Sequence, residues 1–177
     1  MGKKKFSSEL HDSVDGPAKD TIVNMLSHMI DRNHSVMSNP DRYGVDILII
    51  DDVGSVIRGA EVEVKLGWSG GTFPFPSLRI PNRKLGLLML DVPVDFYVLN
   101  REMTHCIEVG IDQMLSSPVV RIDNRYAKDE MFREINITQD NVKDIEYERK
   151  RRWMEERNEL RHVPQFPILG KPDEVRR

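Results

Sequence analysis

The alternation of apolar and polar positions predicts a β-hairpin in the first third of the chain. Residues 45–50 form an almost wholly apolar run, and residues 59–66 alternate between apolar and charged side chains. Because side chains alternate across a strand, one face of the second run would present three charged residues: Glu61, Glu63 and Lys65. A polar turn separates the two runs, so we expect neighbouring antiparallel strands.

Helical spacing of apolar residues predicts one helix before the hairpin and another near the C-terminus. Residues 15–17 read Asp-Gly-Pro, which is a helix-start pattern, and the apolar stripe that follows continues to about Arg32. Thr138 or Asp140 is expected to cap the second helix, which runs to about Arg161 and is crowded with charge. Its few apolar positions predict a helix that lies on the surface or faces a partner.

Further apolar runs extend the expected sheet. Strand candidates lie at residues 85–90, 95–99, 105–109 and 119–122, and Pro93 separates the first two. A helix, a cluster of strands and a final helix indicate an α+β or mixed α/β fold. We expect a mixed central sheet flanked by helices, antiparallel at least at its start.

The chain length suits one domain with loose ends. We expect a flexible N-terminal tail over residues 1–14, a core domain over residues 15–137, and a C-terminal helix with an extended tail over residues 138–177. With 39% hydrophobic residues, the chain can form a core without disulfides or a structural metal. The formal net charge of −3 means that binding of nucleic acid would depend on local basic patches.

The composition also indicates the cellular compartment of the protein. Cys106 is the one cysteine, so an internal disulfide is excluded and we expect an intracellular protein, with Cys106 as a small core residue. No apolar run approaches the roughly 20 residues that span a bilayer, so we expect no membrane association. The basic N-terminus lacks a following apolar stretch, so we expect no secretory signal.

The acidic residues of the predicted hairpin are the strongest candidates for chemistry. A carboxylate at Asp46 is costly if buried among its apolar neighbours, unless it is paired or binds a metal; alternatively, Asp46 merely ends the turn at Gly44. A Glu-x-Lys triplet alone is common and often marks a solvated sheet face. The hairpin, however, would bring Asp46 close enough to Glu63 for the two carboxylates to share a cation.

This arrangement resembles the PD-(D/E)XK nuclease superfamily, which includes restriction enzymes, Holliday-junction resolvases and phage endonucleases. The resemblance covers about residues 15–100 and consists of a helix, an apolar strand headed by Asp46, and Glu63-x-Lys65 on the next strand. The proline expected before the aspartate is absent, since Gly44 and Val45 precede it. The resemblance implies a restriction-endonuclease-like core.

The resemblance implies a catalytic set. Asp46 and Glu63 would bind Mg²⁺ or Mn²⁺ together with the backbone carbonyl of Val64. Lys65 would orient the attacking water or stabilise the transition state, and Glu61 would be an accessory acid or a rim charge. Some members add an acidic residue from the first helix, for which this chain offers three weak candidates: Glu9, Asp20 and Asp31.

The stretch after the hairpin contains basic and aromatic side chains that could bind nucleic acid. A basic cluster would contact the phosphate backbone or be an ordinary solvated loop: Arg79, Arg83 and Lys84. Three aromatic residues of the preceding loop would stack on bases or cover a core edge, and we favour the core: Trp68, Phe73 and Phe75. The charged run at residues 149–152 is interleaved with glutamates, which favours a solvated helix.

The sequence therefore favours a Mg²⁺-dependent DNA endonuclease, intracellular or in the host cytoplasm if phage-encoded. A homodimer is plausible, because cutting two strands commonly requires two active sites. The main alternative is a non-catalytic nucleic-acid-binding or assembly protein with a nuclease-like sheet. An adaptor that docks through its C-terminal helix is a third hypothesis.

Overall fold

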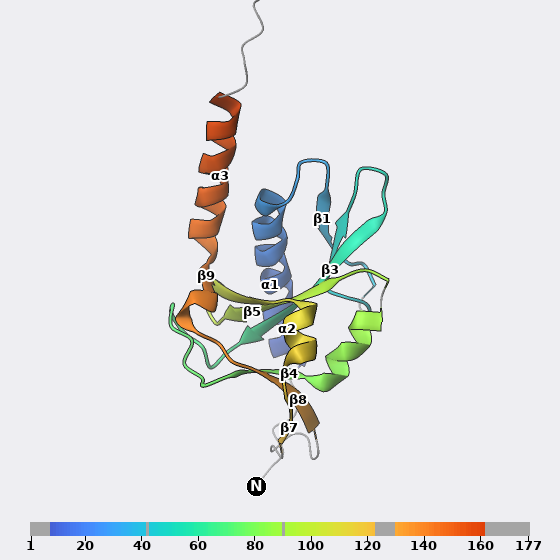
Figure 1. Ribbon diagram of the computed structural model, residues 1–177, viewed down its shortest axis with the longest axis vertical. Helices are drawn as coiled ribbons and strands as arrows, with labels where there is room; N and C mark the ends of the chain where they lie inside the picture. Colours follow the sequence, from blue (N-terminus) through green and yellow to red (C-terminus); the bar gives the residue numbers. More distant parts are fainter. Residues whose placement is uncertain (1–7, 42, 90, 123–129, 162–177) are drawn as a thin grey trace, which may run out of the picture.

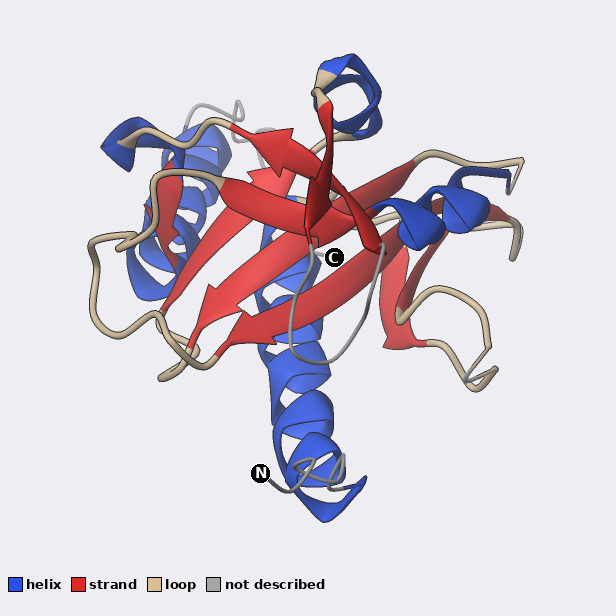
Figure 2. Cartoon of the chain, turned by 90° about the horizontal axis from the view of Figure 1, so that it is seen from below, coloured by secondary structure: helices blue, strands red, loops and turns tan. Residues whose placement is uncertain are grey.

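The computed structural model describes residues 8–41, 43–89, 91–122 and 130–161. These residues form a central six-stranded sheet, a second sheet of three strands, and helices on both sides (Figures 1 and 2). The expected mixed α/β architecture with a central sheet is thereby confirmed. Within these ranges, no helix combines the length and the apolar character needed to cross a membrane.

The central sheet begins as an antiparallel meander and then receives a parallel strand. Its strands, in spatial order, are β1 (Ser35–Ser38), β2 (Ile47–Ile50), β3 (Val56–Lys65), β5 (Val94–Asn100), β6 (His105–Val109) and β9 (Val142–Asp144). All neighbours are antiparallel except β3 and β5, which run parallel. The predicted hairpin is confirmed as β2 and β3, and a parallel neighbour places β3 in the interior of the sheet.

A smaller sheet and two short helical segments accompany the central sheet. They are β4 (Leu78–Pro81), β8 (Glu130–Ile135), β7 (Val119–Ile122), the 3-10 helix η1 (Asn82–Met89) and α2 (Ile111–Ser116). The strand expected at residues 119–122 is confirmed as β7. The strand expected at residues 85–90 is wrong, because residues 85–89 belong to η1. Gly86 lacks a side chain to pack in a strand, which weakens the strand alternative.

Helix α1 (Ser8–Met29) begins earlier than the Asp-Gly-Pro pattern predicts. Residues 8–14, which we expected in the N-terminal tail, are therefore helical, and Pro17 lies inside the helix. Proline removes one backbone donor, but an apolar stripe packed on the sheet stabilises the helix across this position. The hydroxyl of Thr21 also donates to the carbonyl of Pro17 at 2.8 Å.

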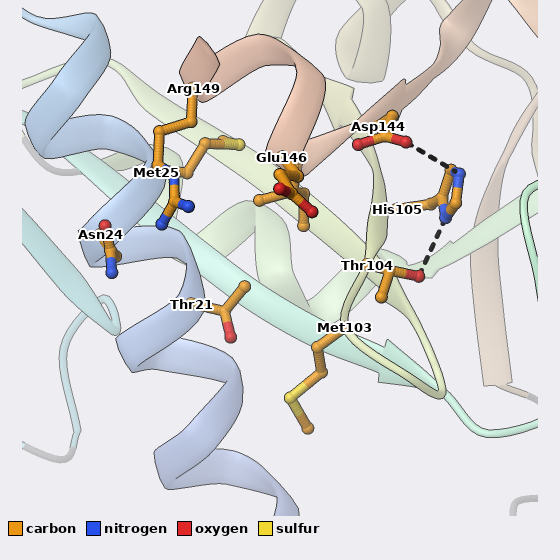
Figure 3. A pocket seen from close by; sticks show the side chains of 10 residues that line it. Thr21, Asn24, Met25, Met103, Thr104, His105, Asp144, Glu146 and Arg149 are labelled. Atoms are coloured by element: carbon orange, nitrogen blue, oxygen red, sulfur yellow. Dashed lines mark hydrogen bonds and ion pairs between the residues drawn. The ribbon is translucent and has the colours of Figure 1, made fainter.

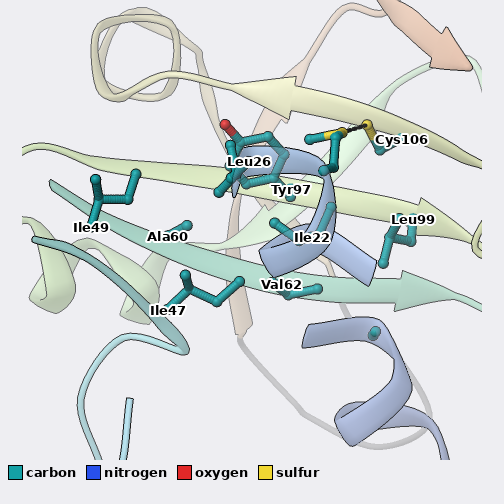
Figure 4. Close-up of a cluster of buried hydrophobic side chains, with 11 residues drawn as sticks. Ile22, Leu26, Ile47, Ile49, Ala60, Val62, Tyr97, Leu99 and Cys106 are labelled. Carbon is teal, nitrogen blue, oxygen red and sulfur yellow. Dashed lines mark hydrogen bonds between the residues drawn. The ribbon is translucent and has the colours of Figure 1, made fainter. Parts of the chain in front are cut away.

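Two cores sandwich the central sheet. On one face, Ile22 and Leu26 of α1 pack against alternating side chains of β2, β3, β5 and β6 (Figure 4). Cys106 is fully buried in this core, as predicted, with Sγ 3.9 Å from Sδ of Met25. The other face packs against residues from the second sheet, α2 and the loop after β3; this core comprises Trp68, Leu78, Ile80, Phe96, Val98, Ile107, Val109, Met114 and Ile135.

The C-terminal helix begins later than predicted. Thr138 caps the 3-10 helix η2 (Gln139–Asn141), β9 follows, and α3 (Ile145–Arg161) starts only after Asp144, which accepts a hydrogen bond from the Tyr147 N–H. The end at Arg161 matches the prediction. Because β9 pairs with β6, the boundary expected after residue 137 does not separate this segment from the core. Beyond β9, α3 first runs beside α1, and its later turns extend beyond the body of the molecule (Figure 1).

Candidate functional site

Asp46 lies at the entrance to β2 and is held by two partners. Its Oδ2 accepts a hydrogen bond of 2.8 Å from the N–H of Val62 on β3, and its Oδ1 lies 2.9 Å from Nζ of Lys19 on α1. The side chain is only 18% exposed. The sequence left open whether Asp46 is a buried, paired carboxylate or merely ends the turn at Gly44. The structure shows the first: a largely buried carboxylate that accepts a hydrogen bond from a backbone N–H of β3.

The register of the hairpin brings Asp46 to Glu61. Ile47 pairs with Ala60, so the next pair outward sets Asp46 opposite Glu61. Glu61 is 8% exposed, and its Oε2 lies 3.1 Å from Nζ of Lys84. Burial raises the pKa of Glu61 to about 7; Lys84 opposes the rise, whereas Asp46 adds to it by repulsion and by hydrogen bonding. Near neutral pH, Glu61 therefore retains a proton for part of the time, and this proton bonds it to Asp46.

Glu63 and Lys65 follow on the same face of β3. Nζ of Lys65 lies 2.5 Å from Oε1 of Glu63 and 3.5 Å from the carbonyl of Arg79. Lys84 stands between the two glutamates, 3.9 Å from Glu63 as well as 3.1 Å from Glu61. The predicted partners Asp46 and Glu63 are thus linked through Glu61 and Lys84, while Glu63 and Lys65 form a direct ion pair. The side chain of Val64 packs on the opposite face, against the α1 core.

The predicted basic cluster is divided between two environments. Arg79 lies 3.0 Å from Glu134 and Arg83 pairs with Glu130, so both cations are tied to strand β8. Lys84 turns inward to the glutamates of β3 instead. In the structure, each of the three cations has a carboxylate partner, and only Lys84 belongs to the acidic cluster.

Sequence reasoning missed Lys19, which closes the site from α1. Nζ of Lys19 bridges Asp15 at 2.8 Å and Asp46 at 2.9 Å. Burial disfavours its charged form, yet hydrogen bonds to both carboxylates outweigh burial and raise the pKa of Lys19. The signal was present: Asp15 and Lys19 are four residues apart and flank the apolar stripe at Ala18 and Ile22.

Of the three acidic residues considered on or near the first helix, the two whose side chains the structure describes take no such position. Asp20 is exposed, and Asp31 lies beyond the end of α1, where it accepts a hydrogen bond from the N–H of Asn33. The side chain of Glu9 lies outside the described residues. Among the described side chains, no three histidine, cysteine, aspartate or glutamate residues are grouped closely enough to hold a metal ion by themselves.

A separate cleft of about 530 Å³ lies between α1, α3 and the β5–β6 turn (Figure 3). Within it, Nδ1 of His105 lies 3.0 Å from the hydroxyl of Thr104, and Nε2 lies 3.8 Å from Asp144. Arg149 and Asn24 line the opposite side. The cleft contains none of the charged residues around Asp46, so it is distinct from the acidic cluster.

Comparison with known proteins found no match for this chain. No protein-family model, no curated protein sequence and no solved structure matches the chain.

Proposed function

We propose that this chain is a metal-dependent endonuclease that hydrolyses phosphodiester bonds of DNA. The observation that supports this most is the side-chain contact between Asp46 and Glu61, with Glu63 and Lys65 next along the same face of β3. A carboxyl pair can hold a hard cation, and an adjacent ammonium can stabilise charge on a phosphate. A metal ion with an adjacent ammonium is one set of groups that can hydrolyse a phosphodiester.

The carboxyl pair fits Mg²⁺ or Mn²⁺. Burial, with the neighbouring Asp46, raises the pKa of Glu61, so ionised Glu61 is costly and a bound cation would stabilise it. Mg²⁺ keeps several of its waters and is often held by one or two carboxylates. Asp46 and Glu61 would hold the ion together with several of its waters, and Glu63 would act through its ion pairs with Lys65 and Lys84. The bound ion would supply a water of lowered pKa.

The remaining charged residues position the reacting groups. Glu63 holds the ammonium of Lys65 at 2.5 Å, on the strand face that the carboxyl pair shares. From there Lys65 orients the attacking water or stabilises the negative charge that develops on the phosphate. Lys84 balances the charge of Glu61 and Glu63, and Lys19 does the same for Asp46.

One observation favours a non-catalytic alternative. Each carboxylate of the cluster already has a lysine partner, as in a purely structural ion-pair network. A DNA-binding or assembly protein of this kind would bind nucleic acid without divalent ions, and its affinity would fall steeply with salt.

A cleavage assay separates the two functions. The purified protein is incubated with plasmid, linear and branched DNA, in Mg²⁺ or Mn²⁺ and in EDTA. We expect cutting that requires the metal and that Lys65→Ala reduces by roughly a hundredfold or more, since a group that stabilises transition-state charge typically contributes that much. Lys143→Ala is the matched control, because Lys143 forms a similar 2.5 Å ion pair with Glu108 between β9 and β6.

Two results would contradict the proposal. Full activity of Lys65→Ala would remove Lys65 from the mechanism. No cutting of any DNA, together with binding that EDTA does not change, would favour the non-catalytic alternative. Sedimentation of the protein with and without DNA would test the expected homodimer.

A further inference from the structure

A small pocket opens directly beside Lys65. Its volume is about 230 Å³, and it is lined by the loop after β3 and by the start of β4. The lining is mostly apolar, with two cations at the edge: Lys65, Phe73, Phe75, Pro76, Ser77, Leu78 and Arg79. Ligand sites for drug-sized molecules span roughly 300–1,000 Å³, so this pocket suits a smaller group.

The three aromatic residues of the loop after β3 are not equivalent, and only Phe73 and Phe75 line the pocket. Trp68 is fully buried and belongs to the core, which confirms for this residue the core role that we favoured. Phe73 packs edge-on against Trp68 at 5.2 Å between ring centroids, and Phe75 packs edge-on against Phe73 at 5.3 Å. Phe75 ends this series and is 41% exposed. The core thus supports a ring that remains accessible to solvent.

Gly67 makes room for that ring. A Cβ at Gly67 would lie 3.1 Å from Cζ of Phe75, so a side chain there would press on the ring. The ring of Phe75 therefore rests on bare backbone, supported by Phe73 on another side. A supported, half-exposed aromatic ring is a platform on which a second flat ring can stack at low entropic cost.

The position of the pocket links it to the proposed chemistry. Lys65 belongs to both the pocket and the acidic cluster, and its ammonium reaches the carbonyl of Arg79 on the pocket wall. The guanidinium of Arg79 is half-exposed beside the pocket. If Lys65 acts on the scissile phosphate, as the proposed function requires, a nucleotide next to that phosphate has its base within reach of Phe75.

We propose that this pocket holds one unstacked nucleobase of the strand to be cut, with the base against Phe75 and its phosphate toward Lys65 and Arg79. This inference rests on the proposed function and narrows the substrate. In a duplex, both faces of a base are covered by its neighbours, so only an unpaired or displaced base can stack on an aromatic side chain. The preferred substrate is therefore single-stranded, branched or otherwise distorted DNA.

Binding of abasic oligonucleotides tests the pocket. A short single strand is made in versions that lack the base at one position in turn, and affinity is measured by fluorescence anisotropy in Ca²⁺ in place of Mg²⁺. We expect one position where loss of the base weakens binding by roughly five- to a hundredfold, the range for stacking of one base on an aromatic side chain. Phe75→Ala should weaken binding of the intact strand equally and remove the effect of the missing base.

Three further variants make the test specific. Phe75→Trp should retain binding, whereas Phe75→Leu, which keeps an apolar side chain, should lose the dependence on the base. Tyr147→Ala on α3, which removes another exposed aromatic ring, should bind as the wild type does. Equal binding by the wild type and Phe75→Ala would overturn the proposal that a base stacks on Phe75. Metal-dependent cutting by the same protein would still support the nuclease proposal. Absence of any DNA binding would overturn both.

Discussion

The protonation of Glu61 offers the sharpest test of the structure. Burial, with Asp46 beside it, raises the pKa of Glu61 from 4.5 to about 7. A raised pKa means that the folded protein holds a proton which the unfolded chain has released. The stabilising effect of this proton is fully present below pH 4.5 and is lost as pH rises to about 7. Each pH unit is worth about 1.4 kcal/mol, so the loss is at most about 3 kcal/mol.

Glu61→Gln isolates this effect. The amide resembles the protonated carboxyl in shape and carries no charge, so the variant has nothing to lose over this range. Urea unfolding of both proteins between pH 4.5 and 8 gives the difference in free energy of unfolding, variant minus wild type. We expect that difference to rise by up to about 3 kcal/mol between pH 4.5 and 7 and then to level off. Groups that titrate in both proteins cancel in the difference.

An exposed carboxylate supplies the control. Hydrogen bonding to Lys150 lowers the pKa of Glu146 on α3, so its stabilising effect is present above its unfolded pKa of 4.5 and is lost below it. Glu146→Gln should therefore show no rise over the same range. A flat difference for Glu61→Gln would refute the reasoning, because it would mean that Glu61 is ionised in the folded protein throughout this range and that burial beside Asp46 has no energetic consequence.

Two other predictions concern the metal and the β5–β6 turn. Millimolar Mg²⁺ should raise the melting temperature more at pH 8 than at pH 6, because the cation competes with the proton on Glu61, and Asp46→Asn should abolish this increase. Asn100→Ala should lower the free energy of unfolding by about 3 kcal/mol in urea titrations, because the buried amide accepts from the N–H groups of Thr104 and His105 and donates to the carbonyl of Gly70. A loss below about 1 kcal/mol would mean that water replaces these bonds.

Local patterns in the sequence were sufficient for the elements whose apolar side chains lie on one face. The alternation at residues 59–66 and the stripe at residues 18–30 predict β3 and α1, because period 2 and period 3.6 each place apolar side chains on one face. Short segments without such a pattern were missed. Strands β1 and β8 are mostly exposed or half-buried, so their apolar residues give no clear signal.

The sequence also predicted which residues make up most of the candidate site, but it did not predict their geometry. The sequence by itself determined that two glutamates and a lysine share one face of β3 and that Asp46 stands at the head of β2. Only the tertiary structure decided that Asp46 faces Glu61, because hairpin register depends on the turn and on the irregularity at Ile49 and Ile50. The partners Lys19 and Lys84 come from α1 and η1, and their contacts with the hairpin depend on packing between elements distant in the chain.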